Sequence, residues 1–142
     1  MKNAAPKRFS RERLIRFAHC DPAGIVYFVH FFDMISGTVE EWFAEVLGTS
    51  YQALHVENRI GFPIVNTQCE FVRPCHFGDT LAIELAIARL GGSSIEFAAR
   101  GVVKGDEKFR GRHKVAMISL DTYKAIAIPA DMRARMAPYV IS

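Results

Sequence analysis

The chain has 142 residues, half of them hydrophobic, which is enough for one domain with its own core. The net charge of +3 is small and the basic residues are spread along the chain, so we expect no nucleic-acid partner. Cys20, Cys69 and Cys75 form no CxxC pair, which argues against a disulfide framework and for a reducing, cytoplasmic compartment. No signal-peptide core and no membrane-length apolar run is present, so we expect no membrane association.

The first half of the chain predicts a strand, a tight turn and a long helix. Residues 1–7 resemble a flexible tail and residues 12–17 a strand, and Asp-Pro-Ala-Gly at 21–24 favours a turn. Apolar residues then recur at intervals of three and four from Phe28 to Leu47, which indicates one amphipathic helix that ends at Gly48. Thr49 or Ser50 is the expected cap of a short helix over 51–58.

The second half predicts consecutive strands. Their expected ranges are 63–73, 79–90, 94–104, 108–120 and a short continuation at 124–128, followed by a closing helix over 130–139. Hairpins that follow one long helix indicate an α+β domain, with an antiparallel sheet of about five strands packed on that helix. We expect the whole chain, 1–142, to form this single domain. Because such a sheet leaves edge strands, a homodimer or homotetramer is expected.

Asp21 is the residue best placed for chemistry. It precedes the long helix, whose N-terminus presents unpaired N–H groups and a partial positive charge that favour an ionised carboxylate. Amides near Tyr27 and Phe28 are positioned to hold an oxyanion, and a carboxylate beside them suits attack on a thioester, directly or through water. Spacing alone still favours a turn or cap role, because Asp before Pro is a common turn opener.

The segment 19–27, His-Cys-Asp-Pro-Ala-Gly-Ile-Val-Tyr, together with the aromatic helix after it, resembles the 4-hydroxybenzoyl-CoA thioesterase group of the hotdog-fold acyl-CoA thioesterases. Weaker matches at 62–65, 71–74, 77–79 and 128–131 extend the resemblance over nearly the whole chain. It implies a curved antiparallel sheet around one long helix, Asp21 as the catalytic residue, and the Phe28 N–H as the group that polarises the thioester carbonyl. It also implies that two subunits build each site.

The resemblance suggests where CoA binds. Similar thioesterases bind the nucleotide part of CoA at a strand junction like that of Arg89, Ser93 and Ser94, where charged and hydroxyl donors suit phosphate. Arg112 shares a strand face with two other basic residues, and this face is either a phosphate contact or an ordinary solvated surface. CoA would arrive as part of the substrate, so no cofactor is expected.

The acyl-binding residues are less well defined. His30, Phe31 and Pro63 are candidates for acyl contacts, although aromatic residues on the helix also suit a plain core. Similar sequences often carry an acidic residue where this chain has Ser36. The resemblance makes an aromatic acyl group such as hydroxybenzoyl the first expectation, and Ser36 leaves a short aliphatic acyl group open as the second.

The sequence leaves two other functions open. One alternative is hydration or dehydration of an acyl thioester, with Asp21 and His30 as the pair, and the other is a domain that binds acyl-CoA without turnover. Cys20 is interpreted as a small buried residue rather than a nucleophile. No spacing of histidines and cysteines indicates a metal site.

Overall fold

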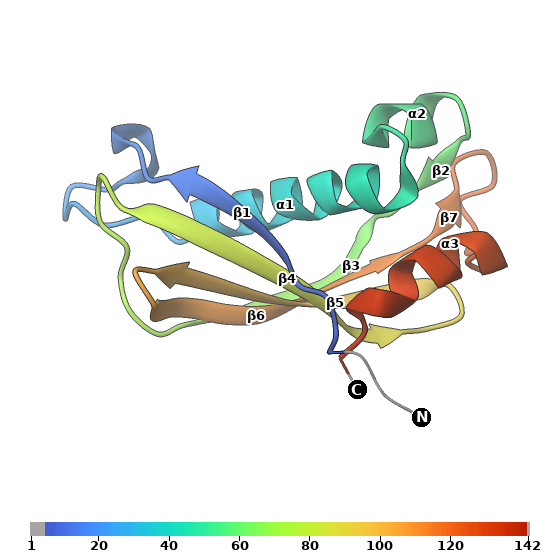
Figure 1. The fold of residues 1–142 in the computed structure, drawn as a ribbon. Coiled ribbons are helices and arrows are strands. Elements are labelled where there is room, and N and C mark those ends of the chain that lie inside the picture. The colour runs from blue at the N-terminus through green and yellow to red at the C-terminus, as the bar shows by residue number, and fades with distance from the viewer. Residues whose placement is uncertain (1–4, 142) are drawn as a thin grey trace.

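The computed structural model describes residues 5–141, so part of the tail expected over 1–7 lies outside the described residues. A five-stranded antiparallel sheet forms the body of the fold, in the order β1-β4-β5-β6-β3. Its strands are β1 (Phe9–Leu14), β3 (Ile64–Phe71), β4 (Thr80–Leu90), β5 (Ser94–Val103) and β6 (Asp106–Ala116). The sheet curves around the long helix α1 (Val29–Leu47), which confirms the predicted α+β layout (Figure 1).

The core lies between α1 and the concave face of the sheet. The helix buries residues spaced three and four apart, among them the fully buried Trp42 and Phe43. Alternate residues of β4 face them and are likewise fully buried, namely Leu81, Ile83, Leu85 and Ile87. Gly48 ends the helix as predicted, since its φ of 70° is left-handed and its N–H bonds to Ala44 O at 3.0 Å.

Smaller elements cover the two ends of the sheet. A short 3₁₀ turn, η1 (Phe17–His19), follows β1, and α2 (Tyr51–Val56) follows α1, capped by Ser50 Oγ, which accepts the Ala53 N–H at 3.0 Å. β2 (Ile60–Gly61) pairs with β7 (Ile118–Ser119) beside α2 (Figure 1). The expected closing helix is α3 (Ala130–Met136), continued by the 3₁₀ turn η2 (Ala137–Tyr139). None of the described helices is both long and apolar enough to cross a membrane.

Two strand predictions need correction. β1 spans Phe9–Leu14 rather than 12–17, because its ladder with β4 runs from the Phe9–Leu85 pair to the Leu14–Thr80 pair, and Phe17 already belongs to η1. Alternating charged residues conceal this strand in the sequence. The expected strand at 124–128 is reduced to one isolated bridge, between Ile118 and Ala125, and most of that segment is exposed.

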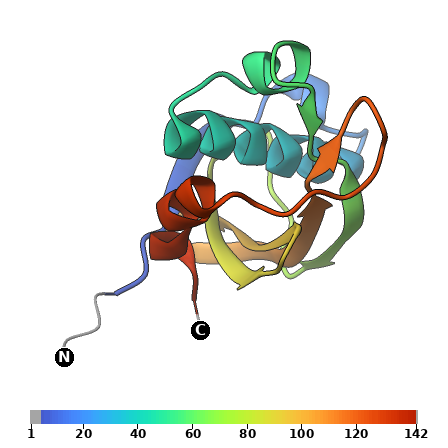
Figure 2. The ribbon, with the colours of Figure 1, turned by 90° about the vertical axis from the view of Figure 1, so that its right-hand side faces the viewer.

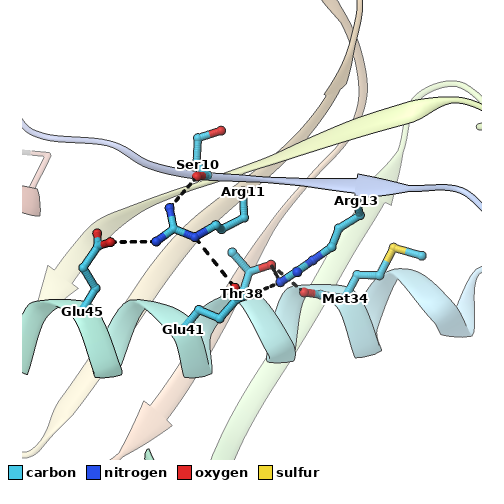
Figure 3. Close-up of polar contacts among 7 residues, drawn as sticks. All are labelled: Ser10, Arg11, Arg13, Met34, Thr38, Glu41 and Glu45. Carbon is cyan, nitrogen blue, oxygen red and sulfur yellow. Dashed lines mark hydrogen bonds and ion pairs between the residues drawn. The ribbon is translucent and has the colours of Figure 1, made fainter. Parts of the chain in front are cut away.

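Polar contacts attach the edge strand β1 to α1 (Figure 3). Arg11 forms ion pairs with Glu45 at 2.7 Å and Glu41 at 3.8 Å. Arg13 bonds to Glu41 and, at 3.2 Å, to the hydroxyl of Thr38. The helix is therefore held by charge along the β1 edge as well as by apolar packing on the sheet.

Candidate active site

The loop that carries Asp21 is a hydrogen-bonded turn. The Gly24 N–H donates to Asp21 O at 2.9 Å, and the Asp21 N–H donates to Ile25 O at 3.0 Å. The carboxylate participates through Oδ1, which accepts the Ala23 N–H at 2.9 Å. Its second oxygen, Oδ2, accepts no hydrogen bond from residues 5–141. The turn therefore orients the side chain and leaves one carboxylate oxygen for chemistry.

Both sides of this turn are tied to neighbouring segments. Cys20 and Val26 form an antiparallel bridge across it, and the Val26 N–H donates to Cys75 O at 2.9 Å. Ile25 forms a second bridge with His76, whose N–H donates to Asp79 Oδ2 at 2.8 Å. The position of Asp21 is thus set by main-chain bridges, and by one bond to the Asp79 side chain directly before β4.

The N-terminus of α1 presents unpaired amides. Phe28 is its N-cap residue, no side chain from the described residues caps the helix, and the first turn contains no acidic residue. The Tyr27 N–H is not available, because it donates to His19 O at 3.0 Å, which corrects the expectation that this amide helps to hold an oxyanion. The amides of Phe28 and Val29 have no acceptor within the described part of the chain. They are the two donors that a developing negative charge can reach.

A cavity of about 420 Å³ opens beside Asp21. Its lining residues are Phe17, Cys20, Asp21, Pro22, Gly24 and Phe77. The rings of Phe17 and Phe77 meet edge to face at 5.7 Å, yet these side chains are 77% and 60% exposed. Neither ring is predicted from the sequence as a site residue, although Phe77 belongs to the matching segment 77–79. An exposed aromatic pair at the mouth of a cavity is a surface that a ligand or another subunit can cover.

An aromatic cluster also lies at the helix start. Phe71, near the end of β3, has its ring 6.1 Å from Phe28, 5.8 Å from Phe31 and 6.2 Å from Phe32. Phe31 is 5% exposed and also packs on Phe109 at 5.1 Å, so in this chain it belongs to the core. Phe28 and Phe71 are about half exposed, which makes them the accessible rings of the cluster.

Ser36 lies further along the same helix face. It follows Phe28 and Phe32 at four-residue steps and is partly buried. Eight residues of helix separate it from Phe28, about 12 Å along the axis at about 1.5 Å per residue. The structure therefore places Ser36 well beyond the helix start, on the side that faces β3.

The two histidines near Asp21 contact each other. The rings of His19 and His30 are 5.5 Å apart, and the His30 ring is also 6.1 Å from that of Tyr27. Burial, followed by the charges of Arg16 and His30, lowers the pKa of His19, and His19 Nδ1 accepts the Arg16 N–H at 2.9 Å. Both observations favour a neutral imidazole that braces η1 against the helix start.

Among residues 5–141, the thiol of Cys20 has one recorded hydrogen-bond contact, and it is with a backbone carbonyl. Cys20 is partly buried, and its Sγ lies 3.7 Å from Arg16 O rather than against the His19 ring. Within residues 5–141, no group of three or more His, Cys, Asp and Glu side chains is arranged to hold a metal ion. The polar chemistry of this end of the molecule is therefore carried by Asp21 and the helix amides.

The predicted CoA-binding residues lie far from Asp21 in the same chain. Arg89, Ser93 and Ser94 surround the β4–β5 turn, at the opposite end of the sheet from the Asp21 loop (Figure 1). β4 alone has 11 residues and spans about 33 Å at about 3.3 Å per residue. Pro63, directly before β3, is at this distant end too. One chain does not bring the two halves of the predicted site together.

Arg112 lies between these ends, on the outer face of the sheet. Its guanidinium is paired with Glu96 at 3.1 Å. The neighbouring Arg110 is paired with Glu70 at 3.1 Å and with Glu107 at 2.5 Å. The charge on this strand face is thus balanced by glutamates, as in an ordinary solvated sheet surface.

Comparison with known proteins places the chain among thioesterases. A family model described as the thioesterase-like superfamily matches residues 15–136. The 1,4-dihydroxy-2-naphthoyl-CoA hydrolase of Synechococcus sp. (strain WH7803) is 30% identical over 124 residues, covering 81% of this chain and 79% of that protein. The identically named hydrolase of Prochlorococcus marinus (strain MIT 9303) is also 30% identical, over 88% of this chain and 80% of its own length.

Solved structures agree with the fold. A thioesterase superfamily protein from Jannaschia sp. CCS1 has a TM-score of 0.90 at 25% identity, and the match covers 100% of this chain and 99% of that one. A crystal structure of 4-hydroxybenzoyl CoA thioesterase superposes with a TM-score of 0.83 at 24% identity, covering 91% and 98%. The second likeness concerns the fold alone, so the specific 4-hydroxybenzoyl-CoA group stays a prediction.

Proposed function

Since this chain belongs to the thioesterase-like superfamily and has its hotdog fold, we propose that it hydrolyses an aromatic acyl-CoA to the free acid and CoA. The observation that carries the proposal is the position of Asp21. Its carboxylate is held in a turn at the start of α1, where the amides of Phe28 and Val29 have no acceptor among the described residues. A carboxylate and two free N–H donors are what hydrolysis of a thioester requires.

The chemistry follows from these two groups. The thioester carbonyl oxygen would accept a hydrogen bond from the Phe28 N–H, which stabilises the negative charge that develops when the carbonyl carbon is attacked. Asp21 either attacks that carbon, releasing the CoA thiolate and leaving an anhydride that water then cleaves, or removes a proton from the water that attacks. Both routes use one carboxylate in one place.

An aromatic acyl group is supported by the rings around the helix start. Phe28 and Phe71 are about half exposed and belong to one cluster of aromatic side chains. The curated relatives are named for a naphthoyl-CoA, which is an aryl thioester. Ser36 supplies a hydroxyl rather than a carboxylate on the same helix face, so we expect the acyl group to carry a neutral polar substituent at most.

A second copy of the chain would complete the site. All of β3 except Cys69 is exposed, and its free edge carries the exposed Ile64, Val65 and Phe71. An exposed apolar edge favours pairing with another strand. Antiparallel pairing of two β3 strands about a two-fold axis would bring the β4–β5 turn of the partner to the end of the sheet that carries Asp21. This arrangement would unite the two halves that one chain keeps about 33 Å apart.

Release of free CoA thiol tests the proposal. The panel comprises benzoyl, hydroxybenzoyl, dihydroxynaphthoyl, phenylacetyl and short aliphatic CoA esters, and we expect the highest kcat/KM among the aryl esters. Asp21→Asn should lower kcat at least about 100-fold, since it removes the nucleophile or base. Asp106→Asn is the matched control, because Asp106 is an exposed carboxylate in the β5–β6 hairpin. Full turnover in Asp21→Asn would exclude the mechanism, and loss of water without thiol release would indicate a hydratase.

A further inference from the structure

We propose that Arg133, on α3, is a positioning residue for CoA. It holds the β4–β5 turn so that the backbone amides of Gly92 and Ser93 face outward and form a cradle for a phosphate group of the nucleotide. The inference rests on the proposed function, because it takes the turn as the place where CoA binds. It adds to that site two main-chain donors and the side chain that sets their direction.

The contacts of Arg133 are with the turn itself. Its Nη2 donates to Gly91 O at 2.7 Å and to Gly92 O at 3.3 Å. Gly92 O also accepts the Ile128 N–H at 2.9 Å. Two successive carbonyl groups are therefore directed toward the C-terminal segment, and α3 and the turn lie at the same end of the molecule (Figure 2).

The direction of the carbonyls determines the direction of the amides. In a planar trans peptide the C=O of one residue and the N–H of the next point in opposite directions. With Gly91 O and Gly92 O turned toward α3, the N–H groups of Gly92 and Ser93 must point away from it. Neither amide donates a hydrogen bond to any residue between 5 and 141. Consecutive amides that face the same side form an anion-binding concavity.

The turn is exposed at Gly92. A Cβ added at Gly92 would meet no atom within 4 Å. A Cβ at Gly91 would lie 2.6 Å from Ser94 Oγ, so that hydroxyl lies directly over the turn. Arg89 is exposed, two residues before Gly91. A phosphate can thus approach the turn at Gly92, with a hydroxyl and a guanidinium nearby.

Arg133 is the group that decides the orientation of the first peptide. The turn is closed by the Gly91 N–H, which donates to Ser94 O at 2.8 Å, and Ser93 O accepts the Met117 N–H at 2.7 Å. These bonds remain when Arg133 is replaced. Gly91 O, however, accepts a hydrogen bond from no described residue other than Arg133. When Arg133 is replaced, the Gly91–Gly92 peptide is therefore free to rotate, and the Gly92 N–H loses its fixed direction.

The test compares one acyl group on two carriers, CoA and pantetheine, because pantetheine lacks the phosphorylated nucleotide. In Arg133→Gln we expect KM for the acyl-CoA to rise about tenfold, because a change of that size corresponds to the loss of about one phosphate contact. KM for the acyl-pantetheine and kcat for both carriers should not change. Arg135→Gln is the control, because Arg135 lies on the same helix but donates to Leu47 O, at 3.2 Å, and not to the turn. Arg133→Lys, which keeps one cationic donor, should restore part of the affinity.

Equal changes in KM for the two carriers, or no change for either, would overturn the proposal. Calorimetric titration with CoA and with adenosine 3′,5′-bisphosphate gives a readout that does not depend on turnover. Weaker binding of CoA and of the bisphosphate to Arg133→Gln supports the role of Arg133 even where no acyl-CoA is hydrolysed. If Arg133→Gln does not fold, Arg133→Lys takes its place in this titration. The titration therefore distinguishes a wrong assignment of the phosphate site from a wrong assignment of the hydrolase activity.

Discussion

Arg13 on β1 bonds directly to Glu41 on α1, although 28 positions separate them in the chain (Figure 3). The pair is partly buried, and Arg13 also reaches the buried Thr38, whose hydroxyl donates to Met34 O at 2.7 Å. A double-mutant cycle with Arg13→Gln and Glu41→Gln should give a coupling of about 0.5–1 kcal/mol in the free energy of unfolding, measured with urea.

The matching cycle on the outer face of the sheet uses Arg110→Gln and Glu70→Gln. That pair is more exposed, with 54% and 66% of the side-chain surface accessible, so its coupling should be smaller. Equal coupling for the two pairs would mean that the β1 contact contributes no more to holding the helix than a surface ion pair does.

The N–H of Phe28 can be removed by a substitution that fits the φ angle of this residue. Its φ of −53° lies within the range of proline, so Phe28→Pro deletes the N–H and keeps the local conformation. Phe28→Ala removes the same ring from the aromatic cluster but retains the N–H. We expect kcat of Phe28→Pro to be about 10²- to 10³-fold below that of Phe28→Ala, because an oxyanion donor is missing.

The adjacent amide provides the comparison for that experiment. Val29→Pro deletes the second free N–H, and a larger loss of kcat there than in Phe28→Pro would assign the oxyanion to Val29. Similar kcat values for Phe28→Ala and for both proline variants would remove the helix N-terminus from the mechanism. Circular dichroism should show native helix content in both Phe28 variants. In Val29→Pro the proline disfavours the αR conformation of Phe28, so kcat of that variant is compared only if its helix content is native.

If each active site is shared between two subunits, two inactive variants should restore activity when they are mixed. If Asp21 of one subunit acts with Arg89 of the partner subunit, a mixed dimer of Asp21→Asn and Arg89→Ala has one site with both defects and one intact site. After random reassociation, with acyl-CoA far below KM, about a quarter of the wild-type activity should return. If both residues of each site came from one subunit, no mixed dimer would contain an intact site, and mixing would restore nothing.

His113 makes stability depend on pH. It is 3% exposed, and burial lowers the pKa of this imidazole below its ordinary value. The unfolded chain therefore binds the proton at a higher pH than the folded one. Its contribution to stability is present above about pH 6.5 and is lost as the pH falls through the lower folded pKa. The free energy of unfolding should decrease from pH 7.5 to 5.5, and less so in His113→Gln.

Thr67 supplies the control for this titration. Its hydroxyl lies 3.2 Å from His113 Nδ1, so Thr67→Val removes the hydrogen bond and keeps the buried imidazole. The pH dependence should survive in Thr67→Val, with His19 contributing in the same direction because its pKa is also lowered. An unchanged pH dependence in His113→Gln would show that other groups are responsible.

Local sequence patterns determined most of the fold. The spacing of apolar residues from Phe28 to Leu47 predicts α1, and the alternation from Leu81 to Ile87 predicts the buried face of β4. Both are properties of neighbouring residues, since a helix repeats every 3.6 residues and a strand every two. β1 was less predictable, because Arg11 and Arg13 occupy its inward positions and find their partners only on α1.

The sequence by itself also identified Asp21 and the helix that follows it, because turn residues and helix periodicity are local signals. Only the tertiary structure decided which amides are free: Tyr27 is bonded to His19, whereas Phe28 and Val29 have no acceptor among the described residues. It likewise placed Arg133 against Gly91 and Gly92, more than 40 positions away in the chain. Hydrogen bonds between distant segments depend on how the chain packs, and no local period in the sequence encodes them.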